Sequence, residues 1–281
     1  MPWHAHLNLQ YRVEQQRCVA RYLHDGPLRI LQSLYPEGDG ICHNVLVHPP
    51  GGLVGGDTLD LQIDVGEGAH GLVTTPGAAR FYRSDGEPAL QHTRITLAAG
   101  ARMEWLPLEA LCFSGCLAEN RLTLNLADGA ELIGWDVTSF GLPHASQPFE
   151  RGHLQQHLEW PGHWLERSRI AADDARLMNG PTGLAGRRCL ATLFLLGGGT
   201  LSRARRDTAL EAARSVIDEA CSCDRLHPLA AGATALHDDG VVVRVLAPVV
   251  EPAMALLRSV RAAWRTQLWQ LPATVPRIWS M

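Results

Sequence analysis

The stretch "LDLQIDVGEGAHGLVTT" (Leu59–Thr75) decides the fold, because it joins two apolar segments through a Gly-Ala pair. Its first half alternates leucine, isoleucine and valine with aspartate and glutamine, which is the period-two pattern of a half-buried strand. Gly68 can adopt the positive φ of a tight corner, which other residues adopt only with strain. Ala69 is small enough for the next strand to pack closely. The stretch therefore predicts a strand, a corner and a second strand.

The same unit recurs twice further along the chain, in "RITLAAGARMEWL" (Arg94–Leu106) and "LTLNLADGAELIGWDV" (Leu122–Val137). The successive Gly-Ala pairs lie 32 and then 29 residues apart. A repeat near thirty residues is typical of solenoids and stacked β structures. We therefore expect a mainly β fold of β-helix-like or layered form. An ordinary β-sandwich with similar hairpins is the alternative that the residues leave open.

Two helices are expected in the C-terminal third. Thr208 is followed three residues later by Glu211, which is the spacing of a capping box. Pro252 suits the first turn of a second helix, and Pro272 ends its apolar stripe. The length of 281 residues fits one large β domain. The helices are expected near 208–222 and 252–270, within a single domain spanning 1–281.

Composition and charge exclude several classes of protein. Hydrophobic residues make up 46% and charged residues 19% of the chain, and the net charge is -4, which is a globular composition. The absence of a basic tract argues against a nucleic-acid partner. The longest apolar run, Cys189–Leu196, is too short to span a bilayer, and the N-terminus lacks the pattern of a secretory signal. We expect a cytoplasmic protein with reduced cysteines and no membrane partner.

The Gly-rich stretch "HPPGGLVGGD" (His48–Asp57) has two readings, a phosphate-binding loop or a bend. A phosphate loop needs Lys and Ser or Thr after its last glycine, and it leads into a helix. Here Asp57 follows Gly56, and a strand pattern comes next. A carboxylate at this position would repel phosphate, so the bend is the better interpretation.

Histidine and cysteine spacing does not predict a closed zinc site. The tightest group is Cys221, Cys223 and His227, which fits the end of a helix more simply than a metal site. Whether these three residues bind metal is left open. Cys112 and Cys116 stand four residues apart. On one strand they would lie roughly 13 Å apart, which is too far for one ion.

Three carboxylates lie beside large apolar residues in strand-like segments: Glu104, Glu109 and Asp136. Such a charge is expected on a solvated face or in an internal polar passage. No nucleophile elbow and no acid–base set is recognisable. The alternative function is a β-solenoid hydrolase or isomerase that uses carboxylates, and its turnover would be lost on Glu104→Gln or Glu109→Gln.

Several stretches closely resemble urease accessory proteins of the UreD family, also called UreH. They lie in the family's order over nearly the whole chain, and the first is the longest and most distinctive. The stretches are His48–Gly86, Met103–Gly115, Glu131–Pro143, Asp239–Pro248 and Pro276–Met281.

The resemblance implies a β-helical scaffold with a pair of helices that is not itself an enzyme. Such proteins bind urease apoprotein and form a complex with a helical accessory protein of the UreF type and a GTPase of the UreG type. The complex helps to deliver nickel to the urease active site. Its GTP chemistry belongs to the GTPase partner, which fits the absence of a phosphate-binding loop from this sequence. No tightly bound cofactor is implied, only nickel in transit.

The family is also thought to pass nickel along an internal polar path. A transit route needs weak, exchangeable oxygen or imidazole ligands, because a closed thiolate site would trap the ion. The resemblance assigns Arg80 and Arg83 to structure or partner contact, because their charge would repel a cation. Leu108 replaces a frequent glutamine, which weakens any ligand role at this position. The candidate path residues are Asp57, Asp60, Glu104, Glu109 and Asp136, with assistance from His48 and His70.

Overall fold

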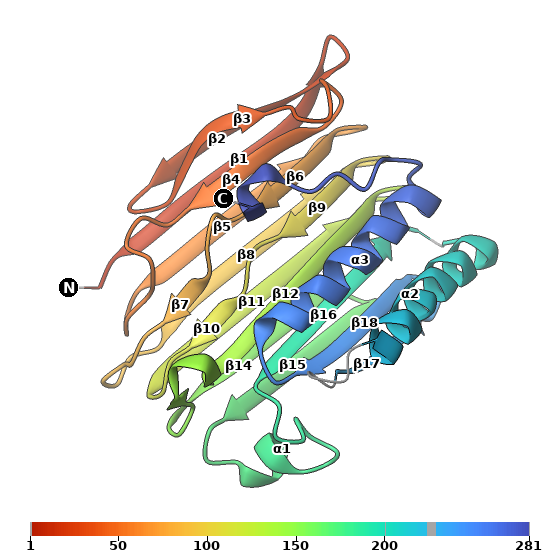
Figure 1. The fold of residues 1–281 in the computed structure, drawn as a ribbon. Helices are drawn as coiled ribbons and strands as arrows, with labels where there is room; N and C mark the ends of the chain where they lie inside the picture. Colours follow the sequence, from red (N-terminus) through yellow and green to blue (C-terminus); the bar gives the residue numbers. More distant parts are fainter. Residues whose placement is uncertain (1, 200, 224–228, 281) are drawn as a thin grey trace.

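The computed structural model describes residues 2–199, 201–223 and 229–280. Within these residues the chain passes back and forth between two sheets, and each repeated unit places one strand in each of them (Figure 1). The repeated units supply parallel neighbours in both sheets, as the sequence predicts. The fold is a β-solenoid-like stack and not a sandwich of hairpins. The units give β5 (Thr58–Val65), β8 (Ala89–Leu97) and β11 (Cys116–Leu126) in one sheet, and β6 (His70–Thr74), β9 (Arg102–Leu106) and β12 (Glu131–Leu142) in the other.

The Gly-Ala corners stack on one another along the coil. Gly68, Gly100 and Gly129 have φ values of +64°, +64° and +73°, which favour glycine. The Gly68 N–H donates to the Ala99 carbonyl at 3.3 Å, and the Gly100 N–H donates to the Asp128 carbonyl at 3.4 Å. The first two corners therefore each use the next one as a hydrogen-bond partner, and the Gly129 N–H donates to the Gly198 carbonyl at 2.8 Å. These bonds fix the register of the coil.

The remaining strands extend both sheets. In the described residues the first sheet has seven strands in the order β15-β14-β11-β8-β5-β1-β2, and the second has eleven, eight of them in the order β17-β18-β16-β12-β9-β6-β4-β3. The added strands of the seven-stranded sheet are β1 (His4–Glu14), β2 (Arg17–Asp25), β14 (Gly152–Trp160) and β15 (Trp164–Ala171). Those of the eleven-stranded sheet are β3 (Arg29–Leu34), β4 (Cys42–Val47), β7 (Ala79–Phe81), β10 (Ala110–Cys112), β13 (Gln147–Pro148), β16 (Cys189–Gly197), β17 (Ala230–Leu236) and β18 (Gly240–Ala247).

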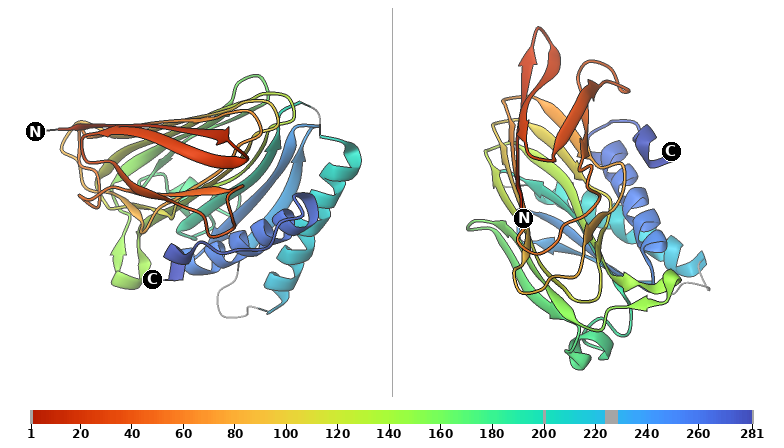
Figure 2. Two further views of the ribbon diagram at one scale, coloured as in Figure 1. Left: turned by 90° about the horizontal axis from the view of Figure 1, so that it is seen from above. Right: turned by 90° about the vertical axis from the view of Figure 1, so that its left-hand side faces the viewer.

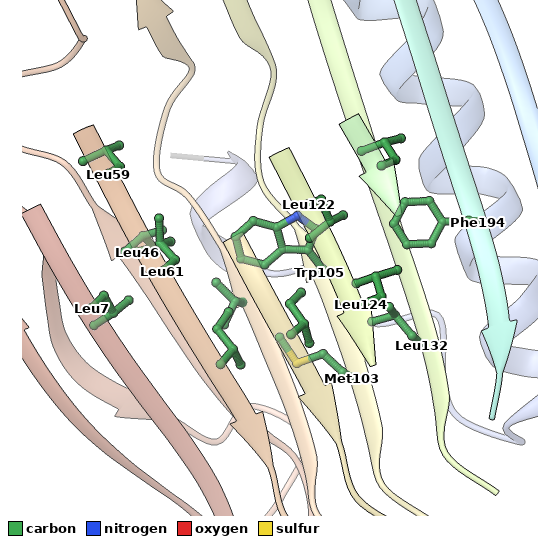
Figure 3. Packing of buried hydrophobic residues seen from close by; sticks show 14 of the residues in the cluster. Leu7, Leu46, Leu59, Leu61, Met103, Trp105, Leu122, Leu124, Leu132 and Phe194 are labelled. Carbon is green, nitrogen blue, oxygen red and sulfur yellow. The ribbon is translucent and has the colours of Figure 1, made fainter. Parts of the chain in front are cut away.

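The main core lies between the two sheets. Leu59 and Leu61 of β5 and Leu122 of β11 face Met103 and Trp105 of β9 across the gap (Figure 3). Each fully buried side chain of this size contributes about 1.5–3 kcal/mol relative to exposure. This burial holds the two walls of the coil together.

A second core lies on the outer face of the eleven-stranded sheet, under the two long helices (Figure 2). Leu257, Val260, Trp264 and Leu268 form the buried stripe of the last helix, as its spacing predicts. No helix of the described residues covers the outer face of the seven-stranded sheet. The helices are α1 (Ala175–Asn179), α2 (Arg203–Cys223) and α3 (Val250–Leu268), with 3-10 turns at Pro143–Ala145 and Arg277–Ser280.

The α2 helix begins earlier than the capping-box spacing indicates. Thr208 lies inside the helix and donates its hydroxyl to the Ala204 carbonyl at 2.8 Å. The cap is Ser202, whose hydroxyl accepts the Arg205 N–H at 3.3 Å. Two cap signals compete in this stretch, and the earlier one starts the helix.

The Gly-rich stretch is a bend that leads into β5, as predicted. Asp57 is buried and accepts the backbone N–H groups of Val54 at 2.9 Å and Trp3 at 3.2 Å. A Cβ at Gly52 would lie 2.4 Å from the Tyr82 ring, so close packing requires glycine there. The stretch therefore fixes a corner of the coil.

The C-terminal residues fold back onto the eleven-stranded sheet. The Trp279 indole donates to the Thr74 hydroxyl at 2.8 Å, and its ring lies 5.3 Å from that of Trp135. The Arg258 guanidinium stands 4.7 Å from the Trp279 ring centroid. The end of the chain is thus part of the second core.

Candidate functional site

A cavity of about 210 Å³ lies between the two sheets, beside the last residues of β4, β6 and β9. Most of its lining is apolar, including leucines of β5 and Trp105 of β9. A few polar side chains converge on it, which is the composition of a ligand or transit site. They are His48, Thr75, Arg80, Gln91, Asn120 and Asp136.

A row of amide side chains crosses the inner face of the seven-stranded sheet beside this cavity. Gln91, Asn120 and Gln156 are direct neighbours on β8, β11 and β14. The Asn120 amide donates to Asp136 Oδ2 at 2.7 Å, and the Gln156 amide donates to the other carboxylate oxygen. A carboxylate from one sheet is therefore held by neutral amides from the other.

The pKa of the Asp136 carboxyl group lies close to neutral pH. Burial raises its pKa, and the hydrogen bonds from Asn120 and Gln156 and the charge of Arg244 oppose this only in part, which leaves a pKa of about 6. The residue still keeps accessible surface, because it faces the cavity. Asp136 can therefore exchange a proton or a cation near neutral pH.

The polar layer continues past Asp136 toward the far edge of the sheets. Thr192 of β16 is the neighbour of Asp136, and Arg244 of β18 is the neighbour of Thr192. Arg244 pairs with Glu166 of β15, so the layer ends in an ion pair between the two sheets. A line of polar side chains thus crosses an otherwise apolar core.

His48 is the imidazole of the cavity. Its ring packs against Trp3, with ring centroids 5.0 Å apart. Burial lowers its pKa and the nearby charge of Asp57 raises it, with a net lowering, so the neutral form is favoured. Its Nε2 is buried without a hydrogen-bond partner in the described residues. Such an orphaned nitrogen is free to bind a ligand.

Glu104 and His70 lie on the opposite face of the eleven-stranded sheet, under α3. Arg261 Nε donates to Glu104 at 2.6 Å, and Arg265 donates to the other carboxylate oxygen. His70 Nε2 stands 3.6 Å from Glu104. Burial alone would raise the Glu104 pKa, but Arg261, His70 and Arg265 together lower it to about 2. Both oxygens of this carboxylate are therefore committed to structural partners.

A second buried carboxylate completes this network. Glu37 accepts a hydrogen bond from Arg265 and lies 2.9 Å from His43 Nε2, and the side chains of all three are buried. Two carboxylates and two guanidinium groups balance in charge, which a buried cluster requires. The network joins the loop after β3, strand β9 and α3, so its role is to fix the helix on the sheet.

The other predicted path residues lie apart from the cavity lining. Asp57 is part of the Gly-rich bend. Asp60 lies on the outer face of the seven-stranded sheet, next to His4 and His92. Glu109 follows β9, and its charge acts on Arg258 of α3. Of the seven residues, the structure brings His48 and Asp136 to the cavity and Glu104 and His70 to the ionic network.

Comparison with known proteins adds to this geometry. A family model described as "UreD urease accessory protein" matches residues 4–280. The chain is 66% identical to "Urease accessory protein UreD" of Polaromonas naphthalenivorans over 283 residues, covering 100% of both chains. It is 65% identical to the protein of the same name from Variovorax paradoxus, with 100% of both covered, and 53% identical to that of Leptothrix cholodnii, with 99% of both covered.

The chain belongs to the UreD family of urease accessory proteins. The resemblance read from the sequence is thereby confirmed, and so is a role as an accessory to urease. In the parts of this UreD chain that the structure describes, no helix is both long and apolar enough to cross a bilayer.

The cysteines of this UreD chain differ in part from expectation. Cys112 and Cys116 are not on one strand, because a turn with the Cys116 N–H donating to the Phe113 carbonyl at 3.0 Å separates β10 from β11. Interaction with the Cys116 thiol, together with burial, raises the Cys112 pKa. Both cysteines are buried, and the spacing expected for one strand does not apply to them. Cys221 is exposed on α2, but His227 lies outside the described residues, so a metal role for that group stays a prediction.

Sequence reasoning missed the amides that hold Asp136, although the signal was present. In β11, Asn120 occupies the same alternation phase as Ala118 and Leu122, which face the core. In β14, Gln156 falls between Leu154 and Leu158 in the same way. A polar residue in the apolar phase of a strand marks an internal polar layer. The same test applied to α3 would have flagged Arg261 and Arg265 inside its apolar stripe.

Proposed function

We propose that this chain binds urease apoprotein and passes nickel toward the urease active site through the polar layer between its sheets. It acts in the cytoplasm with a helical accessory protein of the UreF type and a GTPase of the UreG type. It catalyses no reaction itself and keeps no tightly bound cofactor, because nickel is its cargo. The observation that carries the proposal is the cavity that presents Asp136 and His48.

The chemistry of these two groups suits an ion in transit. Ni²⁺ accepts imidazole and carboxylate ligands, and neither holds it as firmly as thiolates in a closed site would. Asp136 is hydrogen-bonded by neutral amides of Asn120 and Gln156, so its negative charge is available to a cation. With a pKa of about 6 it is mostly ionised at neutral pH. An arriving dication would displace the remaining proton.

The ionic network around Glu104 has a different part in this proposal. Its two guanidinium groups already occupy both oxygens of Glu104. We therefore assign Glu104 and His70 to the docking of α3 and not to the path. Asp57, Asp60 and Glu109 lie outside the cavity lining, which narrows the proposed path to the inner layer.

The alternative of a carboxylate hydrolase gains no support from the cavity. Glycoside hydrolysis uses a pair of carboxyl groups on either side of the bond that is broken. Asp136 is the single carboxylate among the described residues that line the cavity. Glu104, the other strong candidate, has a pKa of about 2 and cannot act as a general acid near neutral pH.

The path is tested by co-expressing urease with the complete accessory set and replacing this chain by variants. We expect Asp136→Asn and His48→Ala to lower urease activity and the nickel content of purified urease by roughly tenfold or more. Asp64→Asn is the matched control, because Asp64 is an acidic residue on the outer face of β5. Full nickel loading with both cavity variants would overturn the path.

The proposed binding of urease apoprotein is tested separately from the nickel path. The tagged chain should co-purify with urease apoprotein when the UreF-type and UreG-type proteins are present. Asp136→Asn should co-purify equally well, since the substitution is internal. Failure of the unmodified chain to retain urease would refute the partner assignment, whatever the nickel result.

A further inference from the structure

The outer face of the seven-stranded sheet gathers histidines around Asp60. His4 and His6 lie on β1, Asp60 on β5 and His92 on β8. In the strand register, His6 is the neighbour of Asp60, and Asp60 is the neighbour of His92. Adjacent strands are about 4.8 Å apart, so these side chains converge over the sheet.

The donor atoms are close enough to share one ion. One ligand atom each from His4, His6 and Asp60 lie within 4.8 Å of one another. His4 Nε2 is hydrogen-bonded to one Asp60 oxygen, and His92 Nδ1 stands 3.5 Å from the other. His4 and His6 are exposed, so an ion can reach them from solvent. Asp60 is thus a carboxylate centred among imidazoles from two neighbouring strands.

We propose that His4, His6, Asp60 and His92 form a surface site for a transition-metal dication of the Ni²⁺ and Zn²⁺ class. Imidazole nitrogen with carboxylate oxygen is the donor set these ions prefer, whereas Mg²⁺ and Ca²⁺ prefer oxygen alone. The donors stand on paired strands and not on loops, so their spacing is fixed before the ion arrives.

The surroundings complete the site with charges of both signs. Asp25 is the neighbour of His6 across β1 and β2. Glu119 lies 3.5 Å from His92 Nε2, a nitrogen that is buried without a hydrogen-bond partner in the described residues. Arg121 pairs with Glu119 at 2.9 Å, and Arg94 also lines the hollow beside the histidines. The two acidic neighbours offset the two arginines, so the field does not exclude a dication.

This site is separate from the proposed path. Leu59 and Leu61, on either side of Asp60, point into the core, so Asp60 points to the opposite face. Binding here is measured on the chain alone, in the absence of urease. Its outcome therefore does not depend on whether the inner layer conducts nickel.

The test is isothermal titration of the full chain, without an oligohistidine tag, against NiCl₂, ZnCl₂ and MgCl₂. We expect the unmodified chain to bind one more Ni²⁺ or Zn²⁺ than a His4→Ala/His6→Ala double variant, and Mg²⁺ not to compete. His144→Ala is the matched control, an exposed histidine that faces Glu251 elsewhere. Equal stoichiometry and affinity in the unmodified chain and the double variant would overturn the site.

A second variant guards against a folding effect in β1. Asp60→Asn preserves the size of the side chain and should weaken Ni²⁺ binding by about tenfold or more. Electron paramagnetic resonance of the chain with one equivalent of Cu²⁺ should show coupling to imidazole nitrogens, and the double variant should lose it. Unchanged Ni²⁺ affinity in Asp60→Asn, at an unchanged melting temperature, contradicts the proposal.

Discussion

Glu104 and Asp136 stand on neighbouring strands of one sheet and show two ways to place a carboxylate inside a protein. Glu104 points outward under α3, where Arg261 and Arg265 bind both oxygens and the pKa falls to about 2. Asp136 points inward, where burial raises its pKa to about 6 against the opposing neutral hydrogen bonds from Asn120 and Gln156. The charge of the partners, more than burial, separates the two residues.

This difference assigns the two carboxylates different tasks. A carboxylate between two guanidinium groups is ionised at neutral pH and fixes a helix to a sheet. A carboxylate between amides sits near its titration point and keeps a free charge for a cation. One sheet thus carries a structural acid on its outer face and an exchangeable acid on its inner face.

The largest expected effect on stability is that of Glu104→Gln. Loss of this charge leaves two buried guanidinium groups with Glu37 alone, so the free energy of unfolding should fall by about 3–5 kcal/mol. Urea denaturation followed by circular dichroism measures it. The Glu104 pKa is lowered from 4.5 to about 2, so its contribution is present above pH 4.5 and is lost as the pH falls toward 2.

Glu109→Gln is the control for that loss, since Glu109 is a half-buried acid a few residues away. We expect its free energy of unfolding to change by less than about 1 kcal/mol. If both substitutions cost the same, the network does not hold α3 in place, and the contrast with Asp136 disappears.

Asp136→Asn should raise the free energy of unfolding at neutral pH, whereas Glu104→Gln lowers it. The folded pKa of about 6 exceeds the ordinary 3.8, so the folded chain binds the proton more tightly, and its stability declines as the pH rises from about 4 to 6. The asparagine variant lacks this decline. The asparagine variant should therefore be more stable than the unmodified chain at pH 7 by about 3 kcal/mol, and the difference in the free energy of unfolding should vanish near pH 4. Denaturation at both pH values measures this, and a less stable variant at pH 7 would contradict it.

The smallest expected effect is a change in the pKa of Asp136, which tests the hydrogen bonds from the amide side chains. Gln156→Leu removes a hydrogen bond to the ionised form of Asp136, so the Asp136 pKa should rise by about one further unit. Carboxyl ¹³C NMR during a pH titration measures this pKa. Gln155→Leu, on the exposed face of the same strand, should leave it unchanged. Equal shifts in both variants would mean that the amide contact is not responsible.

Much of the fold could be predicted because its signals are local. The period-two pattern and the Gly-Ala corners lie within single repeats, and the thirty-residue spacing indicates stacking. The start of α2 was missed because Ser202 and Thr208 both resemble caps, and only one can begin the helix. The positions of the repeated strands followed from the sequence, but the order in which the N-terminal strands join them did not.

The site was less predictable because its contacts join distant parts of the chain. The sequence marks Glu104 and Asp136 as unusual acids, but it does not give the face on which each lies. The partners of Glu104 are 157 and 161 residues away. The histidines around Asp60 depend on β1 lying parallel to β5, a pairing that skips three intervening strands.

The ionic network also has a consequence for the order of biosynthesis. Glu37 and Glu104 leave the ribosome long before Arg265, which follows Glu37 by 228 residues. Until α3 emerges, the outer face of the growing β coil therefore displays two acids and the apolar side chains that the helix later covers. The last helix supplies the guanidinium groups and the apolar side chains that cover this face, so a chain truncated before α3 would expose two acids and an apolar surface to the protein quality-control machinery.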